Sequence, residues 1–308
     1  MHKYILKRIF MLIPVLIGVT FIIFTLSYTT PGCPATMTLG EGAPQEAIEA
    51  LREEWGLDDP FLIRFGRYVI NAAQLDLGET YSTRRPVMTE ILDRFPATLQ
   101  LAIMGLVISI VLGIPLGVIS ATKQYSLFDN MATIFGLIFV SIPNFWLGMM
   151  LVVLFSVNLG WLPPSGFETP AQWILPAFTL GTGQMAMVMR MSRSSMLEVI
   201  RQDYIRTARA KGQKESVVVW NHALRNALIP VVTAVGLTFG FLLGGAVLTE
   251  TIFSINGIGR FMVQSIQGRD NPVINGGVLF LAFSFSVVNL AVDILYAYLD
   301  PRIKSQYK

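Results

Sequence analysis

The segment from Asp203 to Gly212 combines residue types that are typical of a surface in contact with another molecule. Cationic and small side chains share one predicted helix, and a glycine ends it. Small side chains let a short helix seat deeply in the groove of a partner protein, whereas Arg and Lys could instead bind anionic lipid. The residues of this contact segment are Asp203, Tyr204, Arg206, Thr207, Ala208, Arg209 and Gly212.

The sequence carries no pattern for catalysis or for nucleotide binding. A phosphate-binding P-loop needs a Gly-Lys pair, and the sequence contains none. The glycine pairs at 181/183 and 257/259 are typical of close helix approach or of turns. His2 and His222 are too few for a metal site, and the single cysteine excludes an intrachain disulfide. We therefore predict no catalytic residue, no metal and no cofactor on this chain.

Polar residues within apolar stretches are candidates for a transport pathway. Asp293 follows the last charge-free window, about two turns from the tail, and an intramembrane carboxylate is a functional candidate by default. An ion-coupled carrier usually has several such groups near the midplane, with interrupted helices around them, and that pattern is weak here. The pathway candidates are Ser141, Asn144, Gln184, Asn289 and Asp293.

Composition and charge clustering predict an all-α polytopic membrane protein. The 308 residues are 53% hydrophobic and 14% charged, whereas soluble domains carry about 25% charged residues. Six charge-free windows can each supply the roughly 20 apolar residues that a span needs. The first is longer than the apolar part of a signal peptide, so we interpret it as an uncleaved span. The predicted spans are 9–29, about 97–121, about 131–158, about 172–192, about 228–249 and about 275–297.

The distribution of Lys and Arg predicts the orientation of the chain. Basic residues concentrate on the cytoplasmic side of membrane proteins. They are enriched at 1–8, in the loop 193–226 and in the tail, whereas 41–94 holds eleven acidic and six basic residues. Both termini and the loop 193–226 are therefore expected in the cytoplasm, with an extracytoplasmic insertion after the first span.

Apolar spacing also predicts helices outside the spans. In the insertion, Ala47, Ile48, Leu51 and Trp55 share one face, with Gly56 as a cap. A second amphipathic stretch follows at 61–75. In the cytoplasmic loop, helices are expected at 196–211 and 215–224, and Pro230 in the first turn of the fifth span.

The sequence of this loop resembles that of a known protein family. Arg206-Thr-Ala-Arg-Ala-Lys-Gly212 and Ala227-Leu-Ile-Pro230 are similar to the signature loop of permease subunits in bacterial ATP-binding-cassette importers. Only Ala208 and Gly212 match the generic consensus of that loop. The Arg-Thr-Ala-Arg-Ala-Lys-Gly sequence looks like that of the first permease of the oligopeptide/dipeptide branch. Asn256 stands where that family usually has proline. Further similar segments are Gly56–Pro60, Leu75–Gly78, Arg85–Val87, Arg94–Leu99, Leu162–Gly166, Glu250–Phe253 and Gly257–Gly259.

The resemblance implies a type I importer fold, with an insertion at 30–95 and a permease core at 96–308. It also implies peptide import through the bacterial inner membrane, with ATP and Mg on two partner ATPases that the segment 203–212 contacts. A homologous second permease would complete the pathway. An external binding protein would dock near Glu250, Asn256, Gly257 and Arg260; no nucleic acid is expected as a partner. An ion-coupled secondary carrier and a membrane scaffold that recruits a cytoplasmic protein remain alternatives.

Overall fold

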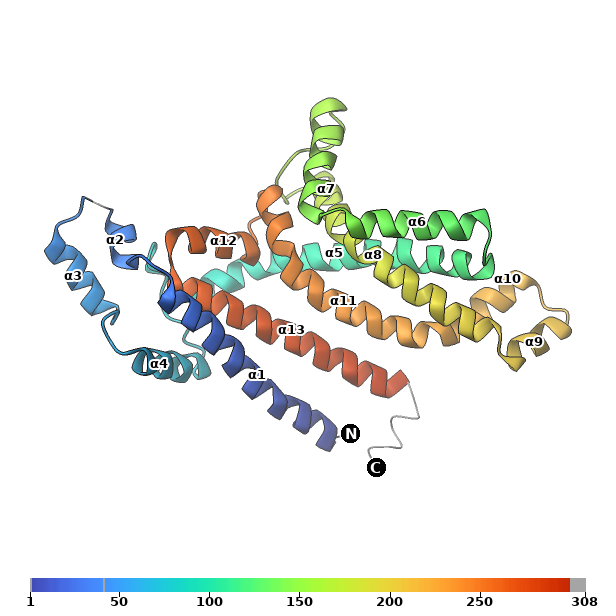
Figure 1. Cartoon of the computed structure of the whole chain (residues 1–308), viewed down its shortest axis with the longest axis horizontal. Coiled ribbons are helices and arrows are strands. Elements are labelled where there is room, and N and C mark those ends of the chain that lie inside the picture. Colours follow the sequence, from blue (N-terminus) through green and yellow to red (C-terminus); the bar gives the residue numbers. More distant parts are fainter. Residues whose placement is uncertain (1, 41, 300–308) are drawn as a thin grey trace.

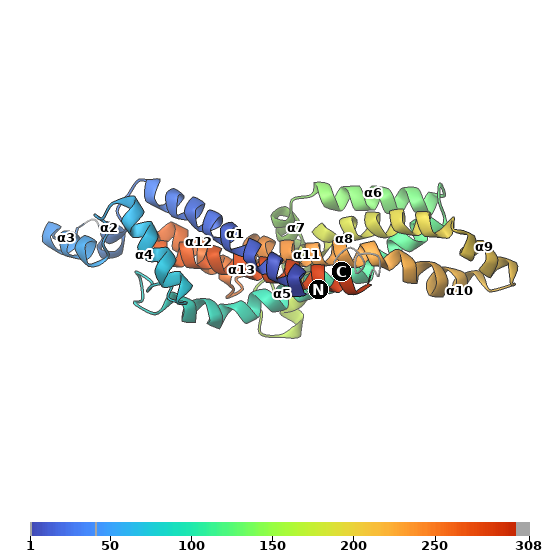
Figure 2. The ribbon, with the colours of Figure 1, turned by 90° about the horizontal axis from the view of Figure 1, so that it is seen from below.

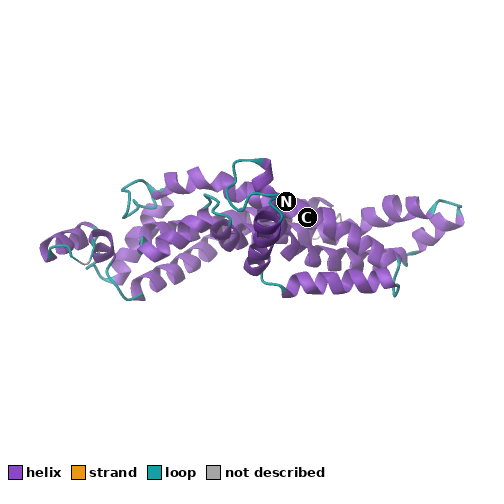
Figure 3. Ribbon diagram, turned by 90° about the horizontal axis from the view of Figure 1, so that it is seen from above, coloured by secondary structure: helices purple, strands orange, loops and turns teal. Residues whose placement is uncertain are grey.

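Long helices form the body of the molecule, as Figure 1 shows. The computed structural model describes residues 2–40 and 42–299. Within these ranges the only β pairing is one isolated bridge, between Glu79 and Pro86, and Figure 3 shows helices joined by loops. The long helices are α1 (His2–Thr29), α5 (Val87–Thr122), α6 (Leu127–Ser141), α8 (Pro170–Ile200), α11 (Leu224–Ile252) and α13 (Asn271–Leu299). This confirms the all-α prediction.

The predicted third span is not one helix. The chain bends by 99° between α6 and the following helical segment, which comprises α7 (Asn144–Leu151) and the π-helical turn η1 (Val152–Asn158). Pro143 lies at the bend, where its missing N–H and its ring stop a helix from continuing. The third span predicted at about 131–158 is therefore bent, and its two helical parts can count together as one span.

Helix α8 lies where the fourth span was predicted, but it is less apolar than the other long helices. Four described helices have the length and composition of a span, or up to five if the bent pair is one, and α8 is not among them. It packs against α5, α6, α7 and α11, and hydroxyls such as Thr179 and Thr182 donate to carbonyls one turn earlier. A helix surrounded by other helices needs less apolar surface than one facing lipid. The predicted count of six spans is not confirmed.

The insertion after α1 forms one end of the molecule, called here the insertion end (Figure 1). Its helices are α2 (Pro34–Leu39), α3 (Gln45–Glu54) and α4 (Phe61–Ala73), which confirms both predicted amphipathic helices. On α3, Ile48 and Leu51 are buried, whereas Ala47 is exposed. Helix α5 begins at Val87, about ten residues before the predicted second span, and Pro96 lies inside it.

The opposite end, called here the hairpin end, is formed between α8 and α11 by α9 (Asp203–Ala210), α10 (Glu215–Val217) and the π-helical turn η2 (Val218–Ala223). The predicted helix at 196–211 is broken at Arg201 and Gln202. The helix predicted at 215–224 runs on into α11, so Pro230 lies inside α11 rather than in its first turn. Figure 2 shows the two ends at opposite extremes of the elongated molecule.

Two of the described helices, α2 and α12, were not predicted. Helix α12 (Ile258–Gly268) occupies most of the segment expected to be an outer loop, and it packs against α5, α11 and α13. Ile258, Met262 and Ser265 form its buried face, at the spacing of one helix face. The tail residues Arg302, Lys304 and Lys308 lie outside the described residues.

Candidate coupling hairpin and pathway cavity

Buried apolar side chains anchor the hairpin to the helix bundle, and Ile205 is the buried residue of α9 among them. Ile205 is fully buried in a cluster with Val118, Met196, Val218 and Ala227, among others. Ala208, one turn later, packs partly against the same cluster. The break before α9 lets α9 fold back, so that Ile205 meets Met196 of α8. Burial of an aliphatic side chain contributes roughly 1.5–3 kcal/mol, which holds α9 to the ends of α5, α8 and α11.

Polar contacts brace the rest of the hairpin. Arg209 donates to both carboxylate oxygens of Glu215, at 3.0 and 2.7 Å, and this carboxylate raises the pKa of the Arg209 guanidinium. The Asn226 side-chain amide donates to the Tyr204 hydroxyl at 2.7 Å, which ties α9 to the start of α11. The hairpin is thus joined to the helix bundle at several points along its length.

The predicted contact residues remain largely available to a partner. Asp203, Tyr204, Arg206, Thr207 and Arg209 are exposed. Gly212 has a φ of +77° with no neighbour near its missing side chain, so glycine is favoured there by backbone conformation rather than by space. The structure therefore brings six of the seven residues onto one exposed helix, with Gly212 just beyond its C-terminal end.

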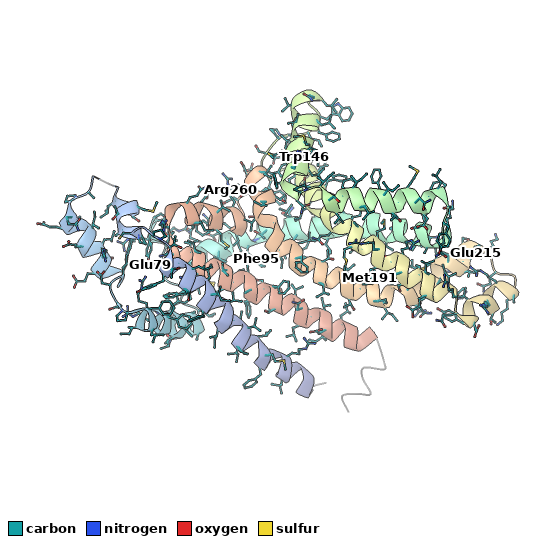
Figure 4. All side chains as sticks on the ribbon, viewed as in Figure 1. Glu79, Phe95, Trp146, Met191, Glu215 and Arg260 are labelled. Carbon is teal, nitrogen blue, oxygen red and sulfur yellow. The ribbon has the colours of Figure 1, made fainter. Side chains whose placement is uncertain are left out.

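A cavity of about 590 Å³ opens between α6, α8 and α11. Its wall includes the candidate Gln184, together with Met187, Arg190 and Thr233. The Thr233 hydroxyl is buried and has no hydrogen-bond partner among the described residues. Figure 4 labels Met191 of α8, which also lines this cavity. A mostly apolar cavity with a few polar groups is the usual form of a ligand path.

The other pathway candidates lie in different places. The Asn144 side chain lies on Gly183, because a Cβ there would be 2.5 Å from its Oδ1, and Ser141 is exposed at the adjoining bend. On α13, Asp293 pairs with Arg8 of α1 at 2.8 Å. Asn289 is also on α13, with its Oδ1 buried. Neither residue lines the cavity between α6, α8 and α11. Asn144 and Gln184 therefore lie near each other beside this cavity, whereas Asn289 and Asp293 lie apart from them on α13.

At the other end, Glu250 is fully buried rather than exposed for docking. Its Oε1 accepts from the Thr98 hydroxyl at 2.7 Å, and its Oε2 accepts from the Arg260 backbone N–H at 3.0 Å. Thr98 accepts in turn from the Ile258 N–H at 2.9 Å. The carboxylate thus lies at the N-terminus of α12, where a negative charge is favoured.

Because the α11–α12 junction is tightly packed, only some of the residues predicted to contact a binding protein are accessible. Gly257 and Gly259 are buried, since a Cβ at Gly257 would be 2.3 Å from the Glu250 carboxyl carbon and one at Gly259 would be 2.5 Å from the Val247 Cα. Both glycine pairs thus serve close approach, as predicted. Asn256 is exposed and Arg260 is half-buried; Figure 4 labels Arg260 at the start of α12.

Four residues that position the hairpin and the α11–α12 junction were not among the site residues predicted from the sequence. Ile205, Asn226 and Glu215 position the hairpin, and Thr98 links α5 to the α11–α12 junction. Thr98 lies within a segment already similar to known permeases, so its motif was a usable signal. Ile205 and Asn226 act through contacts distant in sequence, whereas Glu215 pairs with Arg209, six residues earlier.

A helical membrane core with a mostly apolar cavity, and a braced hairpin exposed at one end, is the architecture of a membrane permease component. The chain belongs to the family described as "Binding-protein-dependent transport system inner membrane component", whose model matches residues 113–305. The model of the N-terminal part of such membrane components matches residues 1–102.

Relatives and solved structures agree with this assignment. The chain is 45% identical to the dipeptide transport system permease protein DppB of Alkalihalophilus pseudofirmus, over 99% of this chain and 100% of that one. It is 43% identical to the glutathione transport system permease protein GsiC of Escherichia coli, covering 99% of each. A solved structure of the MetNI methionine ABC transporter, inward-facing, shares the fold, with a TM-score of 0.60 at 22% identity over 69% of this chain and 97% of that one.

Proposed function

We propose that this chain is one half of the translocation pathway of an ATP-driven peptide importer. The observation that carries the proposal is the exposed hairpin anchored by Ile205, on a chain without a nucleotide-binding motif. The names of the relatives supply the substrate class, small peptides. The hairpin end faces the cytoplasm and the insertion end faces outward, as the charge distribution favours.

The mechanism follows from how the hairpin is joined to the helices. Helix α9 seats in a groove on an ATPase subunit, and closure of the ATPase pair on ATP and Mg moves the hairpin. Because α9 is anchored to Val118 of α5, Met196 of α8 and Ala227 of α11, that motion passes to the helices around the cavity. A second permease closes the open side of this cavity, and an external binding protein delivers peptide to the insertion end.

Reconstitution tests the proposal against its rivals. Proteoliposomes containing this chain, the second permease, the ATPases and the binding protein should take up dipeptide only with internal ATP. Uptake that survives removal of the ATPases but collapses with the ion gradient would establish an ion-coupled carrier. A complete set that binds but moves no peptide would establish a scaffold.

Gly212 supplies a matched pair of variants for the same assay. Gly212→Val should uncouple ATP hydrolysis from uptake, because a β-branched residue is strained at a φ of +77°. Gly212→Asn should retain coupling, since asparagine tolerates the left-handed region. Both variants should insert normally, as nothing lies within 4 Å of the added Cβ. Equal uptake by Val and Asn variants would remove the backbone argument.

A further inference from the structure

A basic cavity of about 500 Å³ lies at the insertion end, between the end of α1, the α2–α4 segment and the start of α13. Of the described residues that line it, three are arginines, Arg52, Arg64 and Arg269, and none is an aspartate or glutamate. Ser27, Thr30 and Asn271 add polar groups to the wall. Three guanidinium groups with neutral hydrogen-bonding neighbours match an anion with several oxygens.

The three arginines differ in how far they are already engaged. Arg52 pairs with Asp58, which lies outside the wall. Arg64 donates to the Leu57 carbonyl at 3.1 Å and lies over the Tyr28 ring. For the half-buried Arg269 side chain, no hydrogen bond or ion pair occurs within the described ranges. Its guanidinium lies against Gly32, where a Cβ would be 3.2 Å from the Arg269 Cζ. Arg269 is thus a cation held in place with its charge uncompensated.

Three further cavities lie beside the basic cavity and share lining residues with one another. The basic cavity shares Arg64 and Asn271 with a second cavity, which in turn shares Leu77 with a third. The third shares Leu16, Ala72 and Leu279 with a fourth. The second cavity is still charged, with Arg64, Arg67 and Asp76 in its wall, whereas the third and fourth are lined mostly by apolar residues such as Ile13, Ile17 and Phe283.

The cavities follow one face of α1 and one face of α13. On α1 they are lined by Ile13, Leu16, Ile17, Thr20, Phe24 and Ser27, a spacing that keeps residues on one side of a helix. Asn271, Asn275, Leu279 and Phe283 do the same on α13. The groove therefore follows α1 and α13, which pack together, from a cationic end to an apolar end.

Helix α4 covers this groove and is itself suited to lipid. Its Phe61 and Phe65 pack edge-on against Phe21 and Phe24 of α1. Its other side exposes Leu62 and Ile70, which are 75% and 61% exposed. Arg64, Arg67 and Asn71 give α4 a polar side as well, and an amphipathic helix of this kind lies at the boundary between head groups and acyl chains.

We propose that this groove binds an anionic phospholipid of the leaflet at the insertion end. The phosphate lies between Arg52, Arg64 and Arg269, and an acyl chain follows the apolar groove past Ala72 and Leu279. Guanidinium groups that converge on one site can hydrogen-bond the several oxygens of a phosphate. The site is separate from the hairpin and from the cavity between α6, α8 and α11, so it goes beyond the proposed function.

Lipid retention tests the proposal directly. The complex containing this chain is purified from bilayers of phosphatidylcholine and phosphatidylglycerol, and retained lipid is counted by native mass spectrometry. The wild type should enrich phosphatidylglycerol several-fold over its bilayer fraction. Arg52→Gln with Arg269→Gln should lose the enrichment, whereas Arg85→Gln, an exposed arginine outside the groove, should keep it. No enrichment, or enrichment that persists without Arg52 and Arg269, would overturn the proposal.

A second arm tests the acyl-chain part. Ala72→Trp fills the groove where two cavities meet and should lose enrichment with all three arginines present. Ala47→Trp, on the exposed side of α3, is the matched control. If only the arginine variants lose enrichment, the acyl groove is not used and the proposal fails in that part.

The single cysteine distinguishes lipid from other anions. Cys33 lines the basic cavity, so phosphatidylglycerol in nanodiscs should slow its reaction with a neutral maleimide several-fold. Inorganic phosphate added to pure phosphatidylcholine nanodiscs should not. Equal protection by free phosphate would replace the lipid with a soluble anion. Loss of binding-protein affinity in the arginine variants, in discs without phosphatidylglycerol, would instead identify a protein contact.

Discussion

At the residue scale, the side chain of Thr98 connects three helices, α5, α11 and α12. Its hydroxyl donates to Glu250 of α11 and accepts from the Ile258 N–H of α12, and it is fully buried on α5. Such a residue fixes the α11–α12 junction through two hydrogen bonds, one of them to a carboxylate.

Replacing Thr98 by Val keeps the shape and removes the hydroxyl. Because two buried polar partners then lose a hydrogen bond, we expect a loss of about 1–3 kcal/mol of stability. Thr98→Ser, which keeps the hydroxyl, should lose less. Thermal unfolding of the detergent-solubilised complex measures both, and equal stability of the Val variant and the wild type would contradict this role.

Asp270 gives a pH-dependent prediction at the same scale. Burial raises the pKa of its carboxyl, although the Tyr81 and Ser82 N–H groups donate to it. A raised folded-state pKa makes its stabilising contribution complete below the unfolded pKa of about 3.9. That contribution is lost as pH rises through the folded value. Asp270→Asn should flatten this loss in melting curves across acid to neutral pH. Parallel curves for variant and wild type would refute it.

At the element scale, α5 and α8 pack through glycines. A Cβ at Gly181 would lie 2.6 Å from the Gly105 carbonyl oxygen, and the Ser109 hydroxyl donates to the Gly181 carbonyl at 2.7 Å. Backbone therefore meets backbone, as in close packing of membrane helices generally.

Gly181→Ala should separate the two helices. Because the contact is with backbone rather than a movable side chain, we expect a cost of about 1–3 kcal/mol. Gly18→Ala is the control: nothing lies within 4 Å of its added Cβ, and alanine is favoured over glycine in a helix by up to about 1 kcal/mol. Melting temperatures should fall for the first variant and hold or rise for the second.

The spans and the insertion helices could be predicted because their signals are local. Charge-free windows marked α1, α5, α11 and α13, and apolar spacing marked α3 and α4. The 99° bend, the burial of Glu250 and the break before α9 depend on contacts between distant segments. Pro143 does not predict the bend by itself, because Pro96, Pro115 and Pro176 lie inside helices. Helix α12 was missed although its buried residues have helical spacing, because its charges suggested a loop.

At the scale of the whole molecule, the outer helices α1 and α13 are joined by charge as well as by packing. Arg8 and Asp293 pair at 2.8 Å, with side chains 45% and 29% exposed. This pairing gives Asp293, selected from the sequence as a pathway residue, a role in holding α1 to the bundle.

Asp293→Asn should therefore affect assembly more than transport. We expect a loss of about 1 kcal/mol or less, as for exposed ion pairs, with uptake per folded complex retained. Arg8→Gln should have a similar cost, and the double variant should be little worse than either single one. If Asp293→Asn abolished uptake in a stable complex, a direct transport role would be restored.

The modest hydropathy of α8 has a consequence for biosynthesis. A translocon releases segments into lipid according to their apolar content, and among the described helices of spanning length α8 alone falls short. Its main packing partner, α5, precedes it in the chain, so α5 is already in the bilayer when α8 leaves the ribosome. We expect α8 to insert poorly when fused alone to a reporter and efficiently behind α5. Helix α5 would then assist the membrane insertion of α8 during synthesis, before the chain is complete.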